Sequence, residues 1–421
     1  MQQHETPRRR LRGLIIPACA SLALALTVAS CGSSGDSGDS GSSTAAAGNA
    51  AAKSSGKPLK IGVAIATSGW MKPYDWGAYT TAQMAADDLN AKGGVNGRKI
   101  EFVVADMKSD PNLGPAAALK VIDSGAEVVL VSCDFDIGSP AALTAQSKGV
   151  VAMSLCAAAP KFGRTGIGPL AFSNGPGTPA TAAAIARWAF ENKKWKNVYM
   201  LKDTANEWSR TYMDYFEQTW KHFGGTIVGK DTFASQKDTS LASQITRIKA
   251  LSTKPDFIVS ATFPPGGPTM LRELRAAGVE TPVVSDSGMD GTFWQKCCPK
   301  LSNFYLGTYA SIYGDDTNPL VNDLLKRFEA KYKQKPLVSY FVSGYNAIEV
   351  LSKAIAKAGT TEGQKLATSM ETFDEETQPL GRTTFSQKWH ISLNRPWTVI
   401  AVQNGKPRFE ARVAPTWVPQ P

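Results

Sequence analysis

Short apolar runs alternate with amphipathic segments along most of this 421-residue chain. Residues 60–66 are apolar and carry several β-branched side chains, a pattern typical of a buried strand. A polar and aromatic loop follows at 67–76. From Gly77 onward apolar side chains recur every three or four residues, which places them on one face of a helix. A second strand is predicted at 98–105, so strand, helix and strand form a crossover unit with two parallel strands.

The same alternation predicts the elements of the rest of the chain. Helices are expected at 115–124, 140–148, 179–192, 209–223, 241–251, 268–277, 318–332 and 340–358. Strands are expected at 126–132, 150–155, 197–201, 226–229, 257–260, 282–285 and 306–310, with a strand-like tail at 381–409. The fold class is therefore α/β, with two similar halves in tandem that each contain a parallel sheet. The first crossing between the halves is expected near Gly177, where a segment dense in glycine and proline ends.

Parallel sheets of this kind bind ligands beyond the carboxyl ends of their strands, so the strand-end loops are the candidate site. No GxGxxG or Walker phosphate loop follows a predicted strand, which argues against a nucleotide enzyme, and no cofactor is expected. An exported hydrolase is also disfavoured. The sequence has no GxSxG elbow, and neither His222 nor His390 lies in a recognisable strand-end loop.

The start of the chain has the pattern of an export signal. Four arginines before residue 13 precede an apolar stretch, 14–28, that is too short to be a comfortable membrane span. Small residues then lead to Cys31, in a pattern that resembles the lipobox of bacterial lipoproteins. We expect residues 1–30 to be a lipoprotein signal peptide and Cys31 to carry the lipid; an ordinary secretory signal or an uncleaved anchor are the alternatives. Residues 31–58 are rich in glycine, serine and alanine, and we expect a disordered tether.

Composition limits the possible partners. The net charge of +10 falls to +7 when residues 1–30, with four arginines and one glutamate, are removed. The remaining basic residues are spread along the chain, whereas nucleic-acid binding would require a clustered basic stripe. We therefore expect no nucleic-acid partner. About 360 residues remain after the tether, which suits two domains of ordinary size.

Four cysteines remain in the exported body, in an oxidising compartment. Cys133 and Cys156 each follow a predicted strand, and the ends of neighbouring parallel strands lie within bridging distance. We predict a disulfide between them. Cys297 and Cys298 are adjacent, and free or externally paired thiols are equally consistent with that spacing. A metal site is not expected, because no histidine is spaced with a cysteine pair.

Several motifs resemble those of one protein family. The most specific is the segment NAKGGVNG at 90–97, followed by Ile100 and Asp106; further matches are Asp110-Pro111, Ala159-Pro160, the helix end at 274–278 and GYNA at 344–347. Together they are similar to the branched-chain amino-acid (Leu/Ile/Val) binding proteins of ABC importers, which have the type I periplasmic-binding fold. The resemblance implies two Rossmann-like lobes joined by a three-segment hinge, a ligand held between them, no enzymatic activity and a monomeric chain. It places the N-terminal lobe at 59–177 and 310–372, and the C-terminal lobe at 178–309 and 373–421.

The family's ligand contacts carry over onto strand-end loops. In the first lobe the family's aromatic contact matches Trp76, and its serine matches Asp136, beside Asp134 and Phe135. The positions that offer a backbone carbonyl and a threonine hydroxyl match Ala157 and Ala158. In the second lobe the matching positions are the covering aromatic at Trp208, the acid at Gln236, and the strand-end residues Phe263 and Asp286.

These positions depart from the pattern that an amino acid requires. A zwitterion needs donors for its carboxylate and an acid for its ammonium group, yet Asp136 and Ala158 replace the hydroxyls and Gln236 replaces the acid. A ligand carboxylate beside Asp134 and Asp136 would be repelled. Flat side chains are gathered instead, at Trp70, Tyr74, Trp76, Phe135, Trp208 and Phe263. They suit an apolar, aromatic, sugar-like or cationic ligand, although each ring could equally belong to the core and each aspartate could equally be a solvated helix cap.

We therefore predict a lipid-anchored, extracytoplasmic substrate-binding protein of an ABC importer. It would capture a small organic solute by hinge closure and dock on a permease in the cytoplasmic membrane. The family default is a branched-chain amino acid, and the departures favour another small compound. A ligand-binding sensor subunit of a membrane signalling system is the alternative. The sequence does not separate these two roles, whereas neighbouring permease and ATPase genes would.

Overall fold

The computed structural model of this protein describes residues 56–420. The predicted signal peptide, Cys31 and most of the predicted tether lie outside this range. No helix within it is long and apolar enough to cross a membrane. The described range contains two large sheets. We call the six-stranded sheet with its helices the first lobe, and the seven-stranded sheet with its helices the second lobe.

The first sheet is entirely parallel, in the order β13-β5-β4-β3-β1-β2. Its strands are β1 (Leu59–Ile65), β2 (Ile100–Asp106), β3 (Val128–Val131), β4 (Val151–Ser154), β5 (Ala171–Pro176) and β13 (Ile391–Ser392). Val63 of β1 pairs with Val104 on one side and Leu130 on the other. Strands β1, β3, β4 and β5 are almost wholly buried, which explains why they read as continuous apolar runs.

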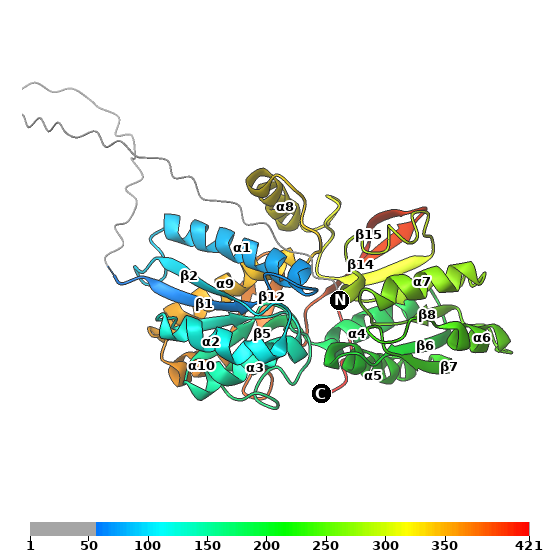
Figure 1. Cartoon of the computed structure of the whole chain (residues 1–421), viewed down its shortest axis with the longest axis horizontal. Helices are drawn as coiled ribbons and strands as arrows, with labels where there is room; N and C mark the ends of the chain where they lie inside the picture. The colour runs from blue at the N-terminus through cyan, green and yellow to red at the C-terminus, as the bar shows by residue number, and fades with distance from the viewer. Residues whose placement is uncertain (1–55, 421) are drawn as a thin grey trace, which may run out of the picture. The chain divides into compact units, whose positions relative to one another are not determined.

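The first lobe's helices cover both faces of this sheet (Figure 1). They are α1 (Lys72–Ala91), α2 (Gly114–Asp123), α3 (Phe135–Ser147), α8 (Pro319–Tyr332), α9 (Phe341–Ala358) and α10 (Gly363–Met370), with the short turn η1 (Pro111–Leu113) and the hairpin β11 (Asp374–Thr377) and β12 (Gly381–Thr384). Helices α1 and α9 lie side by side. A Cβ at Gly344 of α9 would lie 1.6 Å from the carbonyl oxygen of Ala78 in α1, so only glycine permits this close approach.

The second sheet is parallel except at one edge, in the order β15-β14-β10-β9-β8-β6-β7. Its strands are β6 (Asn197–Asp203), β7 (Thr226–Phe233), β8 (Phe257–Val259), β9 (Val283–Ser285), β10 (Phe304–Thr308), β14 (Trp397–Gln403) and β15 (Lys406–Val413), of which the last two are antiparallel additions. Its helices are α4 (Thr178–Arg187), the π-helical turn η2 (Trp188–Asn192), α5 (Glu207–His222), α6 (Ala242–Ala250), α7 (Gly266–Ala276) and the short turn η3 (Ser287–Met289). Helices α4 and α5 pack together on one face, and α6 and α7 lie on the other (Figure 1).

Within the described range the chain crosses between the lobes three times. The first crossing follows β5, as predicted near Gly177, and the second lies between β10 and α8. The predicted third crossing at residue 373 is wrong, because β13 pairs with β5 in the first sheet and the chain leaves this lobe only after Ser392. Residues 373–392 therefore belong to the first lobe. A two-residue strand has no periodicity of its own, and only its partner β5 defines it.

Two helices begin earlier than the periodicity predicts. Helix α1 starts at Lys72 rather than Gly77, because Pro73 fits the first helical turn. Helix α3 starts at Phe135 rather than Pro140, because the carboxylate of Asp134 caps it by accepting from the Ile137 amide. Much of each predicted strand-end loop is therefore helix. The site side chains in these two segments are consequently held on or beside helical first turns.

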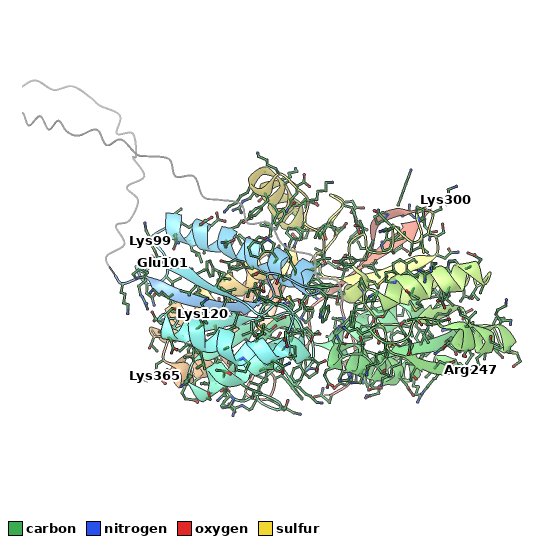
Figure 2. All side chains as sticks on the ribbon, in the orientation of Figure 1. Lys99, Glu101, Lys120, Arg247, Lys300 and Lys365 are labelled. Atoms are coloured by element: carbon green, nitrogen blue, oxygen red, sulfur yellow. A yellow bond between two sulfur atoms is a disulfide. The ribbon has the colours of Figure 1, made fainter. Side chains whose placement is uncertain are left out.

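Exposed charged side chains lie on both lobes. Figure 2 shows Lys99, Lys120 and Lys365 on the first lobe, and Arg247 and Lys300 on the second. All five are exposed. The charge of these residues is thus distributed over the surface rather than gathered in one place.

Candidate ligand-binding site

The two lobes enclose a cavity where strands of both sheets end. Residues that follow β1, β3, β4, β6, β8, β9 and β10 contribute to it, in agreement with the rule that parallel sheets bind ligands at carboxyl ends. About 480 Å³ of space free of protein atoms lies within the lining, part of it open to solvent. The lining residues are Trp70, Met71, Tyr74, Cys133, Asp134, Cys156, Ala158, Thr181, Asn206, Trp208, Phe263, Asp286, Ser287, Gly288, Tyr309, Tyr340 and Trp397.

Trp70 and Tyr74 bring the first lobe into contact with the second. The ring of Trp70 stacks on that of Phe263, with centroids 5.2 Å apart and planes 18° from parallel. Trp70 remains 38% exposed and Phe263 only 3%, so the pair forms one edge of the cavity at the surface. The buried hydroxyl of Tyr74 donates to the carbonyl oxygen of Gly288 at 2.8 Å. The cavity is therefore closed over by direct contacts between the lobes.

Asp75 holds the first-lobe loops in place. Its buried carboxylate accepts from the backbone amides of Ala66, after β1, and Cys133, after β3, each at 2.8 Å. Burial raises the pKa of Asp75 to about 6, although these amide bonds oppose the increase. The side chain thus fixes the start of α1 against two strand ends, and it positions Tyr74 beside the cavity.

Asp134 is a buried cap that also joins the lobes. One carboxylate oxygen accepts from the Ile137 amide at 3.1 Å, and the other accepts from the side-chain amide of Asn206, in the second lobe, at 2.9 Å. Burial, together with the charge of Asp136, raises the pKa of Asp134 to about 7. Asp134 is therefore a helix cap, as the sequence allowed, but one held inside the cavity rather than in solvent.

Asp286 occupies the end of β9 in the second lobe. Its Oδ1 accepts from the indole nitrogen of Trp397 at 2.7 Å, whereas its Oδ2 has no hydrogen-bond partner among the described residues. The side chain is 1% exposed. Burial raises its pKa to about 8, although the bond from Trp397 opposes the increase. A buried carboxylate oxygen without a donor is unusual, so this atom needs a physical explanation.

Aromatic rings form the inner wall. Tyr309 lies 4.8 Å, centroid to centroid, from both Tyr340 and Trp397, and Tyr74 lies 5.0 Å from Tyr340. The hydroxyl of Tyr309 donates to the Cys156 carbonyl, and that of Tyr340 donates to the Ser287 hydroxyl, each at 2.9 Å. These bonds fix the rings, so the wall is organised before a ligand enters.

A disulfide joins Cys133 and Cys156, the pairing that the strand order predicted. Both cysteines belong to the cavity lining, and the bond ties the end of β3 to the end of β4. Cys297 and Cys298 are free and half-buried in the second lobe, outside this lining. Among the described residues, no group of three His, Cys, Asp or Glu side chains could hold a metal ion.

The structure brings together half of the predicted site. Asp134, Ala158, Trp208, Phe263 and Asp286 all line the cavity. Three others lie next to it without lining it: Phe135 packs edge-on against Phe162, Asp136 accepts from the Glu207 amide across the lobes at 2.8 Å, and Ala157 is buried with its carbonyl bound by Ser173.

Two predicted residues lie elsewhere. Trp76 is 38% exposed and packs on Tyr79 of the same helix at 5.6 Å. It turns away because α1 starts early, and Trp70 supplies the first lobe's exposed aromatic at the cavity instead. Gln236 is exposed in a turn after β7 and does not line the cavity. The acid that the second lobe contributes is Asp286.

Sequence reasoning missed the lining residues at the crossings. Tyr309 follows β10 at the second crossing, Trp397 begins β14 just after the third crossing, and Tyr340 precedes α9 in the first lobe. Asn206 caps α5 through the Ser209 amide, a signal that the pattern Asn-Glu-Trp-Ser at 206–209 carries. The three aromatic residues lack such a local signal, because their role depends on the hinge geometry.

Comparison with known proteins agrees with this architecture. The family model described as "Periplasmic binding protein" matches residues 58–407. This chain belongs to the periplasmic binding protein family. Members of the family are extracytoplasmic proteins that bind substrates and are not enzymes, so the cavity is a binding site rather than an active site.

Relatives of this periplasmic binding protein include proteins named for binding amino acids. It is 26% identical to the Leu/Ile/Val-binding protein BraC3 of Rhizobium johnstonii, over 78% of this chain and 88% of the relative. It is 25% identical to the leucine-, isoleucine-, valine-, threonine- and alanine-binding protein of Pseudomonas aeruginosa, over 87% and 96% of the two chains. The structure is similar to that of LivJ from Streptococcus pneumoniae in complex with isoleucine, with a TM-score of 0.71 and 22% identity over 85% of this chain and 99% of the other. This last likeness shows the fold.

Proposed function

We propose that this protein captures a small organic solute outside the cytoplasmic membrane and delivers it to an ABC permease. The observation that carries the proposal is the cavity itself, which both lobes build from strand-end residues and close with direct contacts. A ligand that touches both lobes stabilises their closed arrangement, and a permease then distinguishes the closed form from the open one. The relatives named as amino-acid binding proteins support this role.

We further propose that the solute is not a standard branched-chain amino acid. The described lining contains the carboxylates of Asp134 and Asp286 and no lysine, arginine or histidine. A ligand carboxylate placed there would be repelled wherever these two groups are ionised, and desolvation would strengthen the repulsion. Isothermal titration calorimetry with leucine, isoleucine and valine tests this point. We expect no heat of binding at millimolar ligand, and micromolar affinity for any of the three would contradict the proposal.

A thermal-shift screen tests the role as a solute receptor. A ligand that binds only the folded protein raises the melting temperature, by an amount that grows with its concentration. We expect at least one class of small solute, among amino acids, polyols, aromatic acids and amines, to raise it. A protein that no small solute stabilises would not fit the proposed role.

The proposal includes attachment to the membrane through Cys31, with the folded body acting as a monomer. The lipobox-like pattern before Cys31 supports it. We expect the full-length protein to incorporate a labelled fatty acid and to sediment with membranes in the producing cells. The Cys31→Ala variant should lose the label. Retention of the label by this variant would refute attachment at Cys31.

A further inference from the structure

We infer that the solute is a small organic monocation without a carboxylate group, such as a quaternary or protonated amine, held against Asp286 inside the aromatic wall. The inference rests on the proposed function, because it names the class of solute that the same cavity takes. Three features of the lining carry it: the sign of its charges, one unpaired carboxylate oxygen and the arrangement of its rings.

The charged groups of the lining are all acidic. Asp134 comes from the first lobe and Asp286 from the second, so a ligand between the lobes meets a carboxylate on each side. The buried Arg395 acts electrostatically on Tyr309 but does not belong to the lining, and one of its nitrogens donates to the Asn174 carbonyl at 2.7 Å. Buried charges are stable only when they are paired, so a cationic guest completes this site whereas an anion would be repelled.

Asp286 supplies the point of attachment. Asp134 already accepts from Ile137 and Asn206 with its two oxygens, whereas only Oδ1 of Asp286 is bonded. The Oδ2 atom is buried, unpartnered among the described residues and part of a residue that lines the cavity. An ammonium group provides the missing partner through charge and, when it carries a proton, through a hydrogen bond.

The rings around this point favour a cation over a neutral guest. Seven aromatic side chains belong to the lining: Trp70, Tyr74, Trp208, Phe263, Tyr309, Tyr340 and Trp397. Aromatic faces attract a cation through the quadrupole of the ring, most strongly where water is excluded. The hydroxyls of Tyr74, Tyr309 and Tyr340 donate their protons to protein oxygens, so these protons are not available to a ligand.

The neutral polar side chains of the lining are also engaged. The hydroxyl of Thr181 donates to the Thr178 carbonyl at 3.4 Å, the amide of Asn206 donates to Asp134, and the hydroxyl of Ser287 accepts from Tyr340. A ligand carboxylate would need several strong donors to replace its water. The Ser287 hydroxyl keeps a proton that it can donate, but Thr181 and Asn206 already direct a donor at protein oxygens, so the lining side chains favour a guest without a carboxylate.

The proton affinity of Asp286 gives the site a pH dependence. The groups that face it are Asp290 just after η3, Tyr212 on α5, Tyr309 after β10, Tyr340 before α9 and Trp397 on β14. Burial raises the pKa of Asp286 to about 8, so a bound cation must displace a proton below that pH. The affinity for a cation therefore rises from pH 6 to pH 8.5, and binding releases a proton.

Calorimetry with a charged ligand and its neutral isostere tests the inference. The probes are choline and 3,3-dimethyl-1-butanol, which differ in one atom and one charge. We expect choline to bind with an affinity that rises with pH, and the neutral alcohol to bind at least tenfold more weakly. The Asp286→Asn variant should lose at least tenfold in choline affinity. The matched control Asp88→Asn, which removes a carboxylate outside the lining, should bind choline as the unmodified protein does.

Thermal shift with a wider panel separates this inference from the proposed function. The cations are choline, tetramethylammonium and butylammonium, set against leucine, glycine betaine, glucose and benzoate. If the three cations fail while a neutral, zwitterionic or anionic solute stabilises the protein, the inference is overturned and the proposed function stands. If no solute of any charge class stabilises the protein, both the inference and the proposed function are refuted. Equal binding of the two isosteres, or an unchanged Asp286→Asn variant, would also overturn the inference.

Discussion

Single carboxylates decide the character of the cavity. Asp75, Asp134 and Asp286 are all buried, yet they have different partners and therefore different roles. Asp75 accepts from two backbone amides and positions loops, Asp134 caps α3 and accepts from Asn206, and Asp286 retains one oxygen without a partner among residues 56–420. Residue type alone does not distinguish them. The hydrogen bonds that each one receives leave Asp286 as the carboxylate available to a ligand.

At the residue scale we predict that Asp286 makes stability depend on pH. Its pKa is about 8 in the folded protein, well above the ordinary value, so the folded state binds this proton more tightly than the unfolded state. The free energy of unfolding therefore falls as pH rises from about 4 to about 8, by up to about 1.4 kcal/mol per pH unit for this group. Asp286→Asn removes that dependence. The free energy of unfolding of the variant should therefore increase, relative to that of the ligand-free unmodified protein, as pH rises. Urea unfolding at pH 5 and pH 8 measures the difference.

The control for this experiment is Asp88→Asn. Burial acts to raise the pKa of Asp88, but hydrogen bonds from Arg327 and Tyr345 outweigh it and leave the pKa lowered. A lowered carboxyl pKa contributes stability that is lost only below the ordinary carboxyl pKa of about 4, so the difference between this variant and the unmodified protein should stay constant between pH 5 and pH 8. If both variants follow the same pH trend, the assignment to Asp286 is incorrect.

Strands and helices with a clear local pattern were predicted correctly, and those defined by their neighbours were not. Buried strands such as β1, β3 and β4 were predictable because their apolar runs are continuous, and amphipathic helices such as α5 and α9 because they bury one face. The prediction missed β5 within the segment 163–177, whose glycines and prolines suggest a loop. It is a strand because β4 and β13 supply its pairing partners, and this information is absent from the local sequence.

At the element scale we predict a marked loss of stability when the disulfide is removed. Cys133 and Cys156 are separated by 23 residues, and closing a loop of this length in the unfolded chain is worth about 3 kcal/mol. The double variant Cys133→Ala with Cys156→Ala should lose about this much in denaturant unfolding. The control pair, Cys297→Ala with Cys298→Ala, removes two free thiols and should change stability far less. Equal losses in the two double variants would refute a stabilising cross-link.

For the whole molecule, the contacts between the lobes matter most. Tyr74 bonds to Gly288, Asp136 accepts from the Glu207 amide, and Lys161 pairs with the Glu207 carboxylate at 2.8 Å. All of these contacts join the first lobe to the second. These contacts stabilise the closed arrangement, and a bound ligand adds contacts of its own. Weakening one of them should therefore shift the population towards an open form.

At this scale we predict that Tyr74→Phe opens the ligand-free protein. The variant keeps the ring and removes the donor to Gly288, which is worth about 1 kcal/mol. Small-angle X-ray scattering should show a larger radius of gyration. Tyr332→Phe is the matched control, because its hydroxyl bonds to the Thr80 carbonyl within the first lobe. An unchanged radius for Tyr74→Phe, or an equal increase for Tyr332→Phe, would contradict a role for this contact in closure.

The sequence by itself determined the α/β class, the two halves, the family and five residues of the cavity lining: Asp134, Ala158, Trp208, Phe263 and Asp286. These follow from local periodicity and from short motifs at strand ends, and both act over a few neighbouring residues. Only the tertiary structure decided that Trp70 rather than Trp76 meets the second lobe, that Tyr309, Tyr340 and Trp397 form the wall, and that Asp286 has a free oxygen. The reason is that closure brings together residues more than a hundred positions apart. Their contacts depend on the hinge, which no local pattern in the chain specifies.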